Sequence, residues 1–516
     1  MKNRSDVRRI RFSLPRMTKQ RTARRNSAVN PDFSPAAAPA DEQSRIALDE
    51  SARTPTVVYF ATAVVWLVVG SVFGLLTGLK FSLPDLLGTI PALTFGRIRP
   101  AHLNTIMYGW ASLAGCGMIV WLTTRLCKVQ LQLGWFHYVS ALLWNLGVLG
   151  GTIAVLAGYS QGLEWLEFPR IFGAMIAAGF LLFAASVVQT FRVRQVEHLY
   201  VSLWYILASL LWFPLLYVVA NLGLYQGVVE AAMNWWFGHN ALAVWFTPIG
   251  LAGAYYFIPK VLGRPIYSYY LGLLGFWAFA LFYNWNGIHH LVGGPVPTWL
   301  VTVSIVASVM MVVPVLAVAV NHHLTTVGHF RMLRFSPTLR FVVFGSMSYT
   351  AVSFQGSLES IRSFQEVAHF THYTIGHAHL GVYGFLSMIL FGAMYYIMPR
   401  LARWEWPYPS LIKAHFWTTA IGIALYVVTM SIGGWIQGLQ MNDAAIPFID
   451  VVQNTKLWLW GRSIGGTLML IGHLIFAYQF FSIIKRAGPR RFAPALFREP
   501  APIEAVRIEE RAAKAG

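Results

Sequence analysis

Long apolar runs separated by short polar segments make up most of this chain. A helix of about 20 apolar residues crosses a bilayer, and a window of that length finds about twelve such runs. They begin near Val57, His102, Phe136, Ile171, Tyr200, Met233, Tyr267, Val296, Phe341, Tyr373, Leu411 and Leu457. The pattern predicts an all-α membrane protein whose membrane domain covers residues 54–487, with no room for a sizeable soluble domain.

The two ends of the chain lack such runs. Residues 1–53 are rich in Arg and then in Ala, Pro and Ser, without the apolar segment of a signal peptide. This composition predicts a disordered N-terminal tail, and a mitochondrial transit peptide is the alternative. Residues 488–516 are predicted to form a second tail on the same side of the membrane.

Charged residues are few and sorted by loop. Only 11% of residues are charged, yet 39 Lys and Arg against 20 Asp and Glu give a net charge of +19. The bases gather in alternate loops and the acids, Glu359 among them, in the intervening loops, so the positive-inside rule places both termini in the cytoplasm. Topology and anionic lipid account for the basic excess, which excludes nucleic-acid binding. Cys116 and Cys127 form neither a CxxCH haem-attachment motif nor a zinc-type cluster.

One apolar run, from Tyr373 to Met398, contains two histidines two residues apart. Each helical residue turns by about 100°, so His377 and His379 face opposite sides of one helix. Such a pair could ligate two separate groups, for instance a haem on each side. The alternative is an ordinary hydrogen-bonded pair of membrane histidines.

Four further histidines are predicted to lie near the same depth. His102 opens the second span, His239 lies in the sixth, and His289 and His290 end the seventh. Polar residues at bilayer depth are costly and usually functional. Six histidines converging at one level therefore predict metal binding.

Three of the six can form one site. His239, His289 and His290 offer three imidazoles, which suit copper, with zinc or iron as alternatives. The two neighbouring histidines require a loosened helix end, which Gly293 and Gly294 would permit.

The other three histidines suit haem. His102 and His379 could hold one haem iron from both sides, which closes it to other ligands. His377 would bind a second haem from one side only and leave its other face toward the three-imidazole metal. Arg97 and Arg99 are outer-face bases that buried haem propionates would pair with.

Tyr283 lies seven residues before His290, on roughly the same helix face. A hydroxyl beside a redox metal would be a donor of a hydrogen atom and a proton. The alternative is a packed aromatic side chain, since the chain has 22 tyrosines.

Other polar residues have weaker signals. Glu164 and Glu167, in an outer loop, could bind a hard cation such as calcium or simply be solvated. Five histidines fall at cytoplasmic helix ends or loops and are predicted to be surface residues: His137, His198, His322, His323 and His329.

Several motifs together resemble the catalytic subunit I of C-family, or cbb3-type, haem-copper cytochrome c oxidases. They are FGRIRPAHLNT, WWFGHNA, YYFIPK with RPIYSYYL, the Tyr283 to His290 segment, and HYTIGHAHLG, and the similarity runs from about residue 57 to about residue 485. The resemblance implies a twelve-helix bundle in the bacterial inner membrane that reduces O2 to water and pumps protons. It also implies electrons from cytochrome c, delivered through membrane-anchored haem c subunits.

The resemblance further implies residue roles. The ligands would be His102 and His379 for a low-spin haem b, His377 for a high-spin haem b, and His239, His289 and His290 for copper. Tyr283 matches the family's tyrosine, which is crosslinked to a copper-ligating histidine. Polar positions of the family's proton path match Thr247, Tyr255, Tyr349 and Ser353.

The chain departs from the family pattern at a few positions. Gln355 stands where the family has a glutamate near the active site, and an amide cannot carry a proton as a carboxylate can. Gly272 and Gly275 replace polar groups on the seventh span. These departures predict altered proton delivery, with the ligand set intact.

Two other functions fit parts of the pattern. A nitric oxide reductase has the same haem ligands but binds a non-haem iron in place of copper. A glutamate helps to bind that iron, and its position is Ala243 here. Such reductases also lack the tyrosine that is Tyr283 in this chain. A transporter or non-catalytic haem protein would carry intramembrane Asp or Glu, which the spans nearly lack. The sequence therefore favours an oxidase.

Overall fold

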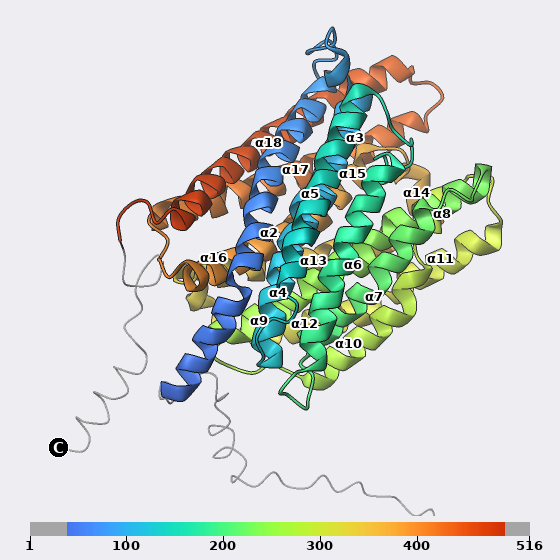
Figure 1. The fold of residues 1–516 in the computed structure, drawn as a ribbon. Helices are drawn as coiled ribbons and strands as arrows, with labels where there is room; N and C mark the ends of the chain where they lie inside the picture. The colour runs from blue at the N-terminus through green and yellow to red at the C-terminus, as the bar shows by residue number, and fades with distance from the viewer. Residues whose placement is uncertain (1–38, 491–516) are drawn as a thin grey trace, which may run out of the picture.

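The computed structural model describes residues 39–490, and within them the chain is a bundle of long helices (Figure 1). The α-helices are α2 (Pro39–Lys80), α3 (Phe95–Asn104), α4 (Leu113–Cys127), α5 (Trp135–Ala157), α6 (Arg170–Arg192), α7 (Val201–Asn221), α8 (Gly227–Ala241), α9 (Thr247–Leu262), α10 (Tyr269–Phe282), α11 (Thr298–Met310), α12 (Val312–Thr326), α13 (Pro337–Glu359), α14 (Arg362–Ala368), α15 (His372–His379), α16 (Met388–Ala402), α17 (Pro409–Met441) and α18 (Phe448–Ile484). Residues 39–490 contain no strand, which confirms the all-α class.

Shorter helical segments connect or interrupt the α-helices. Four are 3-10 segments: η2 (Pro91–Leu93), η5 (Tyr283–Trp285), η6 (Ile288–Leu291) and η7 (Phe330–Arg334). Three are π-helical: η3 (Thr105–Ser112), η4 (Leu242–Phe246) and η8 (Leu380–Ser387). The π segments lie inside membrane spans, joining α3 to α4, α8 to α9 and α15 to α16.

Ten helices of the described chain are long and apolar enough to cross a membrane. The predicted seventh and ninth spans correspond to α10 and α13, which are not among the ten. α10 has only 14 residues before the chain changes to a 3-10 segment. α13 has 23 residues, but polar side chains such as Ser346, Tyr349 and Ser357 interrupt its apolar surface. The count of twelve spans stays a prediction.

The first helix starts earlier than the hydropathy pattern predicts. α2 begins at Pro39, so the predicted disordered tail is wrong for residues 39–53. Tertiary contacts explain the extension, because Asp49 accepts a hydrogen bond from the Trp121 indole at 2.9 Å and pairs with Arg125 at 3.5 Å. The tail predictions for residues 1–38 and 491–516 fall outside the described residues.

Two spans form the centre of the bundle. In the most apolar windows of Phe95–Cys127 and Gly227–Leu262, 94% of the residues are buried, against 39% for α6 and α18 at the periphery. α18 packs beside α2, so the first and last helices are neighbours (Figure 1). The outer faces carry exposed apolar side chains such as Leu142 and Leu211, as a lipid-facing surface requires.

Candidate metal centre

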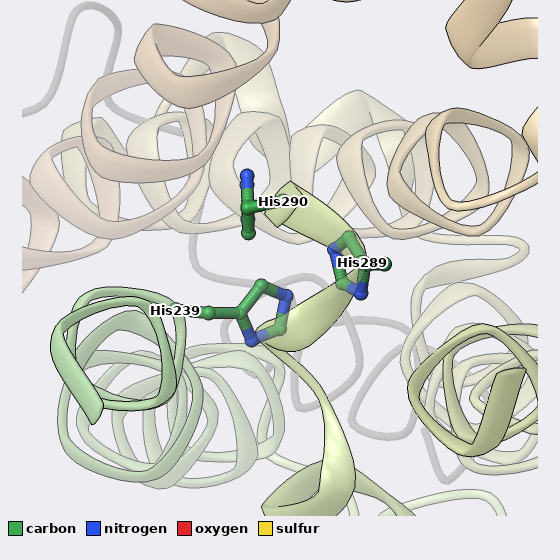
Figure 2. A group of neighbouring side chains, drawn as sticks. All are labelled: His239, His289 and His290. Carbon is green, nitrogen blue, oxygen red and sulfur yellow. The ribbon is translucent and has the colours of Figure 1, made fainter. Parts of the chain in front are cut away.

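Three imidazoles meet inside the bundle. One nitrogen from each of His239, His289 and His290 lies within 4.8 Å of the others. Figure 2 shows the three rings around a common space, with His239 on α8 and the other two on η6. No other group of three or more His, Cys, Asp or Glu in residues 39–490 has metal-binding spacing. Neutral imidazoles at this spacing are a donor set that fits a copper ion.

A chain break before the two neighbouring histidines allows them to converge. α10 ends at Phe282, and Gly287 takes a φ of 111°, which side chains other than glycine rarely adopt. A Cβ atom at Gly287 would also lie 2.7 Å from the Trp235 carbonyl oxygen. The prediction that Gly293 and Gly294 loosen the helix end is therefore wrong in position, since the helix has already ended before His289.

Hydrogen bonds and stacking orient the rings on η6. The hydroxyls of Ser304 and Ser308 each lie 3.1 Å from Nδ1 of His289. His290 stacks on Trp235 with ring centroids 4.4 Å apart and planes 14° apart. A polar partner on the non-ligating nitrogen is typical of metal-binding histidines, because it fixes the tautomer and the ring orientation.

His102 and His379 face each other. Their ring centroids are 6.4 Å apart and their planes differ by 15°. Nδ1 of His102 donates to the Gly70 carbonyl at 2.7 Å, and Nδ1 of His379 donates to the Ile375 carbonyl at 2.8 Å. In a neutral imidazole each Nε2 therefore carries no proton, and its lone pair can bind a metal. Metal-nitrogen bonds of roughly 2 Å on each side, together with the two ring radii, fill this separation, so the pair fits a shared iron.

His377 faces away from that pair, toward the three-imidazole cluster. It interacts electrostatically with His239, and His289 and His290 both interact with it. Its Nδ1 lies 3.8 Å from Oε1 of Glu359, and neither of these buried atoms has a hydrogen-bond partner.

Glu359 is a residue that sequence reasoning missed. It is only 5% exposed, although the charge pattern assigns it to an outer loop. The signal was its position four residues after Gln355, which places it on the same face of α13 one turn later. Gln355 interacts with Tyr373. The buried carboxyl group beside His377 is that of Glu359.

Tyr283 lies against the three-imidazole cluster. Its ring is 5.6 Å from that of His239, at 70°, and its side chain hydrogen-bonds with Thr247. Tyr283 is the first residue after α10, so the extrapolation of one helix face from Tyr283 to His290 does not hold. After the break at Gly287, the His290 ring also reaches His239, with ring centroids 5.4 Å apart.

The three π-helical segments each start within three residues of a site histidine: η3 after His102, η4 after His239 and η8 after His379. π-helical turns occur frequently at functional sites. They are also bonded to one another. Trp110 of η3 donates to Ser387 in η8 at 2.9 Å, and Trp245 of η4 donates to Ser112 in η3 at 3.0 Å. These bonds fix the three histidine-bearing helices at a common depth.

The predicted proton-path residues lie in the core. Thr247, Tyr255 and Tyr349 are buried, while Ser353 and Gln355 are half-buried. Tyr349 interacts with the hydroxyl of Ser353. The Tyr255 ring lies 4.4 Å from that of His322.

Two histidines predicted to be surface residues are buried. His322 is 2% exposed and its Nδ1 lies 2.8 Å from the Ser346 hydroxyl. His137 is 1% exposed and contacts the hydroxyl of Tyr59 at 3.3 Å. Their position near helix ends suggested exposure, but neighbouring helices cover both.

The outer-face charges pair with one another. Arg99 makes two hydrogen bonds to Glu164, at 2.6 and 3.1 Å, and Arg97 donates to the Leu156 carbonyl. Glu164 thus has a cationic partner, and calcium binding there stays a prediction.

Sequence reasoning missed Arg462 on α18. This side chain is 6% exposed and lies over the rings of Phe81 and Tyr426, and its buried Nη1 has no partner.

The second loop acid is buried rather than solvated. Glu167 is 4% exposed and accepts a hydrogen bond from Asn104 at 2.6 Å. Burial raises its pKa to about 7, although the Asn104 hydrogen bond opposes this shift. Because folding raises the pKa of Glu167, the folded state holds this proton more tightly than the unfolded chain does. The contribution of protonated Glu167 to the free energy of unfolding is therefore complete below the ordinary pKa near 4.5 and is lost as pH rises through about 7.

We expect Glu167→Gln to remove this pH dependence. Relative to the variant, the native protein should lose about 3 kcal/mol of stability between pH 4.5 and pH 7, which thermal unfolding in detergent across that range would measure. The exposed Glu366→Gln is the control and should follow the native protein. Parallel stability curves for the native protein and Glu167→Gln would contradict the prediction.

Comparisons with known proteins agree with this arrangement. Residues 54–468 match the family model described as cytochrome c and quinol oxidase polypeptide I. The cbb3-type cytochrome c oxidase subunit CcoN1 of Stutzerimonas stutzeri is 30% identical over 449 residues, which cover 84% of this chain and 95% of that protein. Cytochrome c oxidase subunit 1 of Rhodobacter capsulatus is 31% identical, over 76% of this chain and 78% of that one.

A more distant relative and a solved structure also match. A nitric oxide reductase chain of Stutzerimonas stutzeri is 25% identical over 82% of this chain and 93% of that protein. A solved structure of a haem-copper terminal oxidase dimer superposes with a TM-score of 0.68 at 14% identity, covering 86% of both chains. On the match over residues 54–468, this chain belongs to the cytochrome c and quinol oxidase polypeptide I family, the haem-copper oxidase subunits I, and it resembles the cbb3-type members of that family.

Proposed function

We propose that this chain is the catalytic subunit of a terminal respiratory oxidase that reduces O2 to water, with cytochrome c as the electron source. The observation that carries the proposal is one juxtaposition. Three imidazoles with nitrogens within 4.8 Å interact with His377 and pack against the ring of Tyr283. The relatives named cytochrome c oxidase support it.

The six histidines are proposed as ligands. His239, His289 and His290 would hold copper, His377 a high-spin haem b, and His102 and His379 a low-spin haem b. When bound, these groups would supply single electrons and an open metal pair for a diatomic substrate. Arg462, whose buried Nη1 has no partner, would be a propionate partner. Arg97 and Arg99 would serve in the same role through the donors that they do not use for the Leu156 carbonyl and Glu164.

The protein's own side chains would supply protons. The Tyr283 ring packs against His239, and its hydroxyl hydrogen-bonds with Thr247. Tyr283 would give up its proton at the site and regain one when the Thr247 hydroxyl turns away from the Leu242 carbonyl, to which it now donates. Tyr255, Tyr349 and Ser353 would continue the path away from the site, with His322 beside Tyr255. Coupling of this path to proton translocation is part of the proposal.

Nitric oxide reduction fits this chain less well. The position where such reductases have a glutamate is Ala243, which is fully buried in η4. Tyr283 also contacts the cluster. A non-catalytic paralogue would have no reason to keep the cluster, Tyr283 and the bonded serines together.

The oxidase proposal includes partners and a location. Membrane-anchored cytochrome c subunits would pass electrons to this chain, which lacks a haem c attachment motif of its own. Ten apolar helices of the described chain fit the bacterial inner membrane, and the loop charges support cytoplasmic termini.

Metal analysis combined with optical difference spectra would test the proposal first. We expect two b-type haems and one copper per chain, with carbon monoxide bound by only one of the haems. Non-haem iron in place of copper would indicate a nitric oxide reductase. A protein without haem would overturn the assignment of all six histidines.

We expect Glu359→Gln to raise the reduction potential of the carbon monoxide-binding haem. The Glu359 carboxyl lies 3.8 Å from Nδ1 of His377, and when it is ionised it makes a ligating imidazole more basic, which favours oxidised iron. Redox titration measures the change. The low-spin haem should keep its potential, and the exposed Glu366→Gln should alter neither. Equal shifts of both haems would argue against a specific Glu359–His377 interaction.

A further inference from the structure

A second row of buried hydroxyl and imidazole groups lies outside the proposed proton path. Its members are Ser71, His473, Tyr383, Thr419, His415 and Tyr395. His415 and His473 are 0% and 3% exposed, and neither belongs to the six histidines of the metal centre. Ionisable side chains at this depth are costly, and where they form chains they commonly relay protons.

His473 has a partner on each ring nitrogen. Its Nδ1 lies 2.7 Å from the Ser71 hydroxyl, and its Nε2 lies 2.7 Å from the Tyr383 hydroxyl. Ser71 donates its own proton to the Leu67 carbonyl, so Nδ1 of His473 donates to Ser71 and Nε2 accepts from Tyr383. A further proton can therefore arrive only at Nε2, from the Tyr383 side.

The other half of the row is built around His415. Its Nδ1 lies 2.8 Å from the Tyr395 hydroxyl, and its buried Nε2 has no partner. Thr419, one turn further along α17, interacts with Tyr383.

The two halves meet at Gly472. A Cβ atom there would lie 2.5 Å from Cγ2 of Thr419 and 3.4 Å from Cδ2 of His415. Gly472 precedes His473 directly, so the absence of a side chain lets this turn of α18 pack against Thr419 and His415, and His415 interacts electrostatically with His473.

One end of the row lies near His102, and the other lies near the predicted cytoplasmic side. Ser71 follows Gly70, whose carbonyl accepts from His102. At the other end, the carbonyl of Tyr395 accepts from the Trp406 indole at 3.0 Å. Trp406 lies in the loop between α16 and α17, on the predicted cytoplasmic side.

We propose that this row takes up a proton when the group held by His102 and His379 is reduced. The inference rests on the proposed low-spin haem at that pair. One proton passes through the Tyr383 hydroxyl to Nε2 of His473. The resulting imidazolium offsets the charge of the one electron received from the donor. The titratable or polar groups facing His473 are Tyr383 and Ser71, which bond to its ring, and His415, which interacts with it electrostatically.

The test is a redox titration of the low-spin haem at several pH values in the purified oxidase complex. In the native protein the reduction potential should fall as pH rises. His473→Gln, which keeps hydrogen bonds but cannot take up a proton, should lower that slope by at least half. A merely structural effect would shift the potential equally at every pH, and this outcome would overturn the proposal.

Two further variants sharpen the test. Tyr383→Phe removes the hydroxyl at Nε2 of His473 and should slow proton uptake after rapid reduction, followed with a pH-indicator dye, by at least tenfold. His137→Gln removes another buried histidine that contacts a tyrosine hydroxyl, and it should change neither quantity. Unaltered uptake in Tyr383→Phe would overturn the route, whereas absence of a low-spin haem from the native protein would overturn the proposed function instead.

Discussion

Replacement of Tyr283 by Phe should abolish most O2 reduction while both haems and the copper stay bound. The substitution removes one hydroxyl and keeps the ring that packs 5.6 Å from His239. Positioned proton donors contribute about a hundredfold to ten-thousandfold to a rate, so turnover should fall by at least about a hundredfold. Oxygen consumption and the carbon monoxide difference spectrum, recorded on the same sample, measure the two halves of this prediction.

The matched control for Tyr283→Phe is Tyr59→Phe. Tyr59 is also buried, and its hydroxyl bonds to Ser140 at 2.9 Å, away from the three imidazoles. It should retain nearly full turnover. If Tyr283→Phe also retained full turnover with normal spectra, its hydroxyl would not be the proton donor.

Replacement of His289 by Ala should remove the copper and leave both haems in place. Two imidazoles would remain, and they come from different segments, α8 and η6. Loss of a partner that only orients a ligand costs about 10- to 100-fold in metal affinity, so loss of the ligand itself should cost at least as much. Copper per chain, determined by mass spectrometry, should fall to near zero, and O2 reduction should be lost with it.

Ser308→Ala provides a graded comparison for His289→Ala. It removes one of the two hydroxyls at Nδ1 of His289 and should weaken copper retention against a chelator without abolishing it. His137→Ala, which removes a buried histidine elsewhere, should keep the copper. Full copper occupancy in His289→Ala would place the metal at a different site.

The sequence predicted much of the site because bilayer burial restricts polar residues so strongly. Six histidines in apolar runs could be found without any structure, and the spacing of His377 and His379 correctly placed them on opposite helix faces. The same rule missed Glu359 and Arg462, since both lie close to the ends of predicted spans, where charged residues are common. It also missed His415 and His473, which no motif connects to the other histidines.

Backbone geometry was less predictable. Hydropathy cannot distinguish a π-helical turn from an α-helical one, because both bury the same apolar residues. The three π segments are seen only once Trp110 and Trp245 reach serines on other helices. In the sequence, Gly287 cannot be distinguished from other glycines, because only the folded chain places the Trp235 carbonyl beside it.

The sequence by itself determined that this is a membrane protein of the all-α class and selected the six histidines that we propose as ligands, because the cost of burying polar groups in lipid acts on each residue separately. The tertiary structure alone decided which imidazoles share a centre, where the seventh predicted span breaks, and which carboxylate faces His377. Those outcomes depend on contacts between residues far apart in the chain, and only the packed helices bring them together.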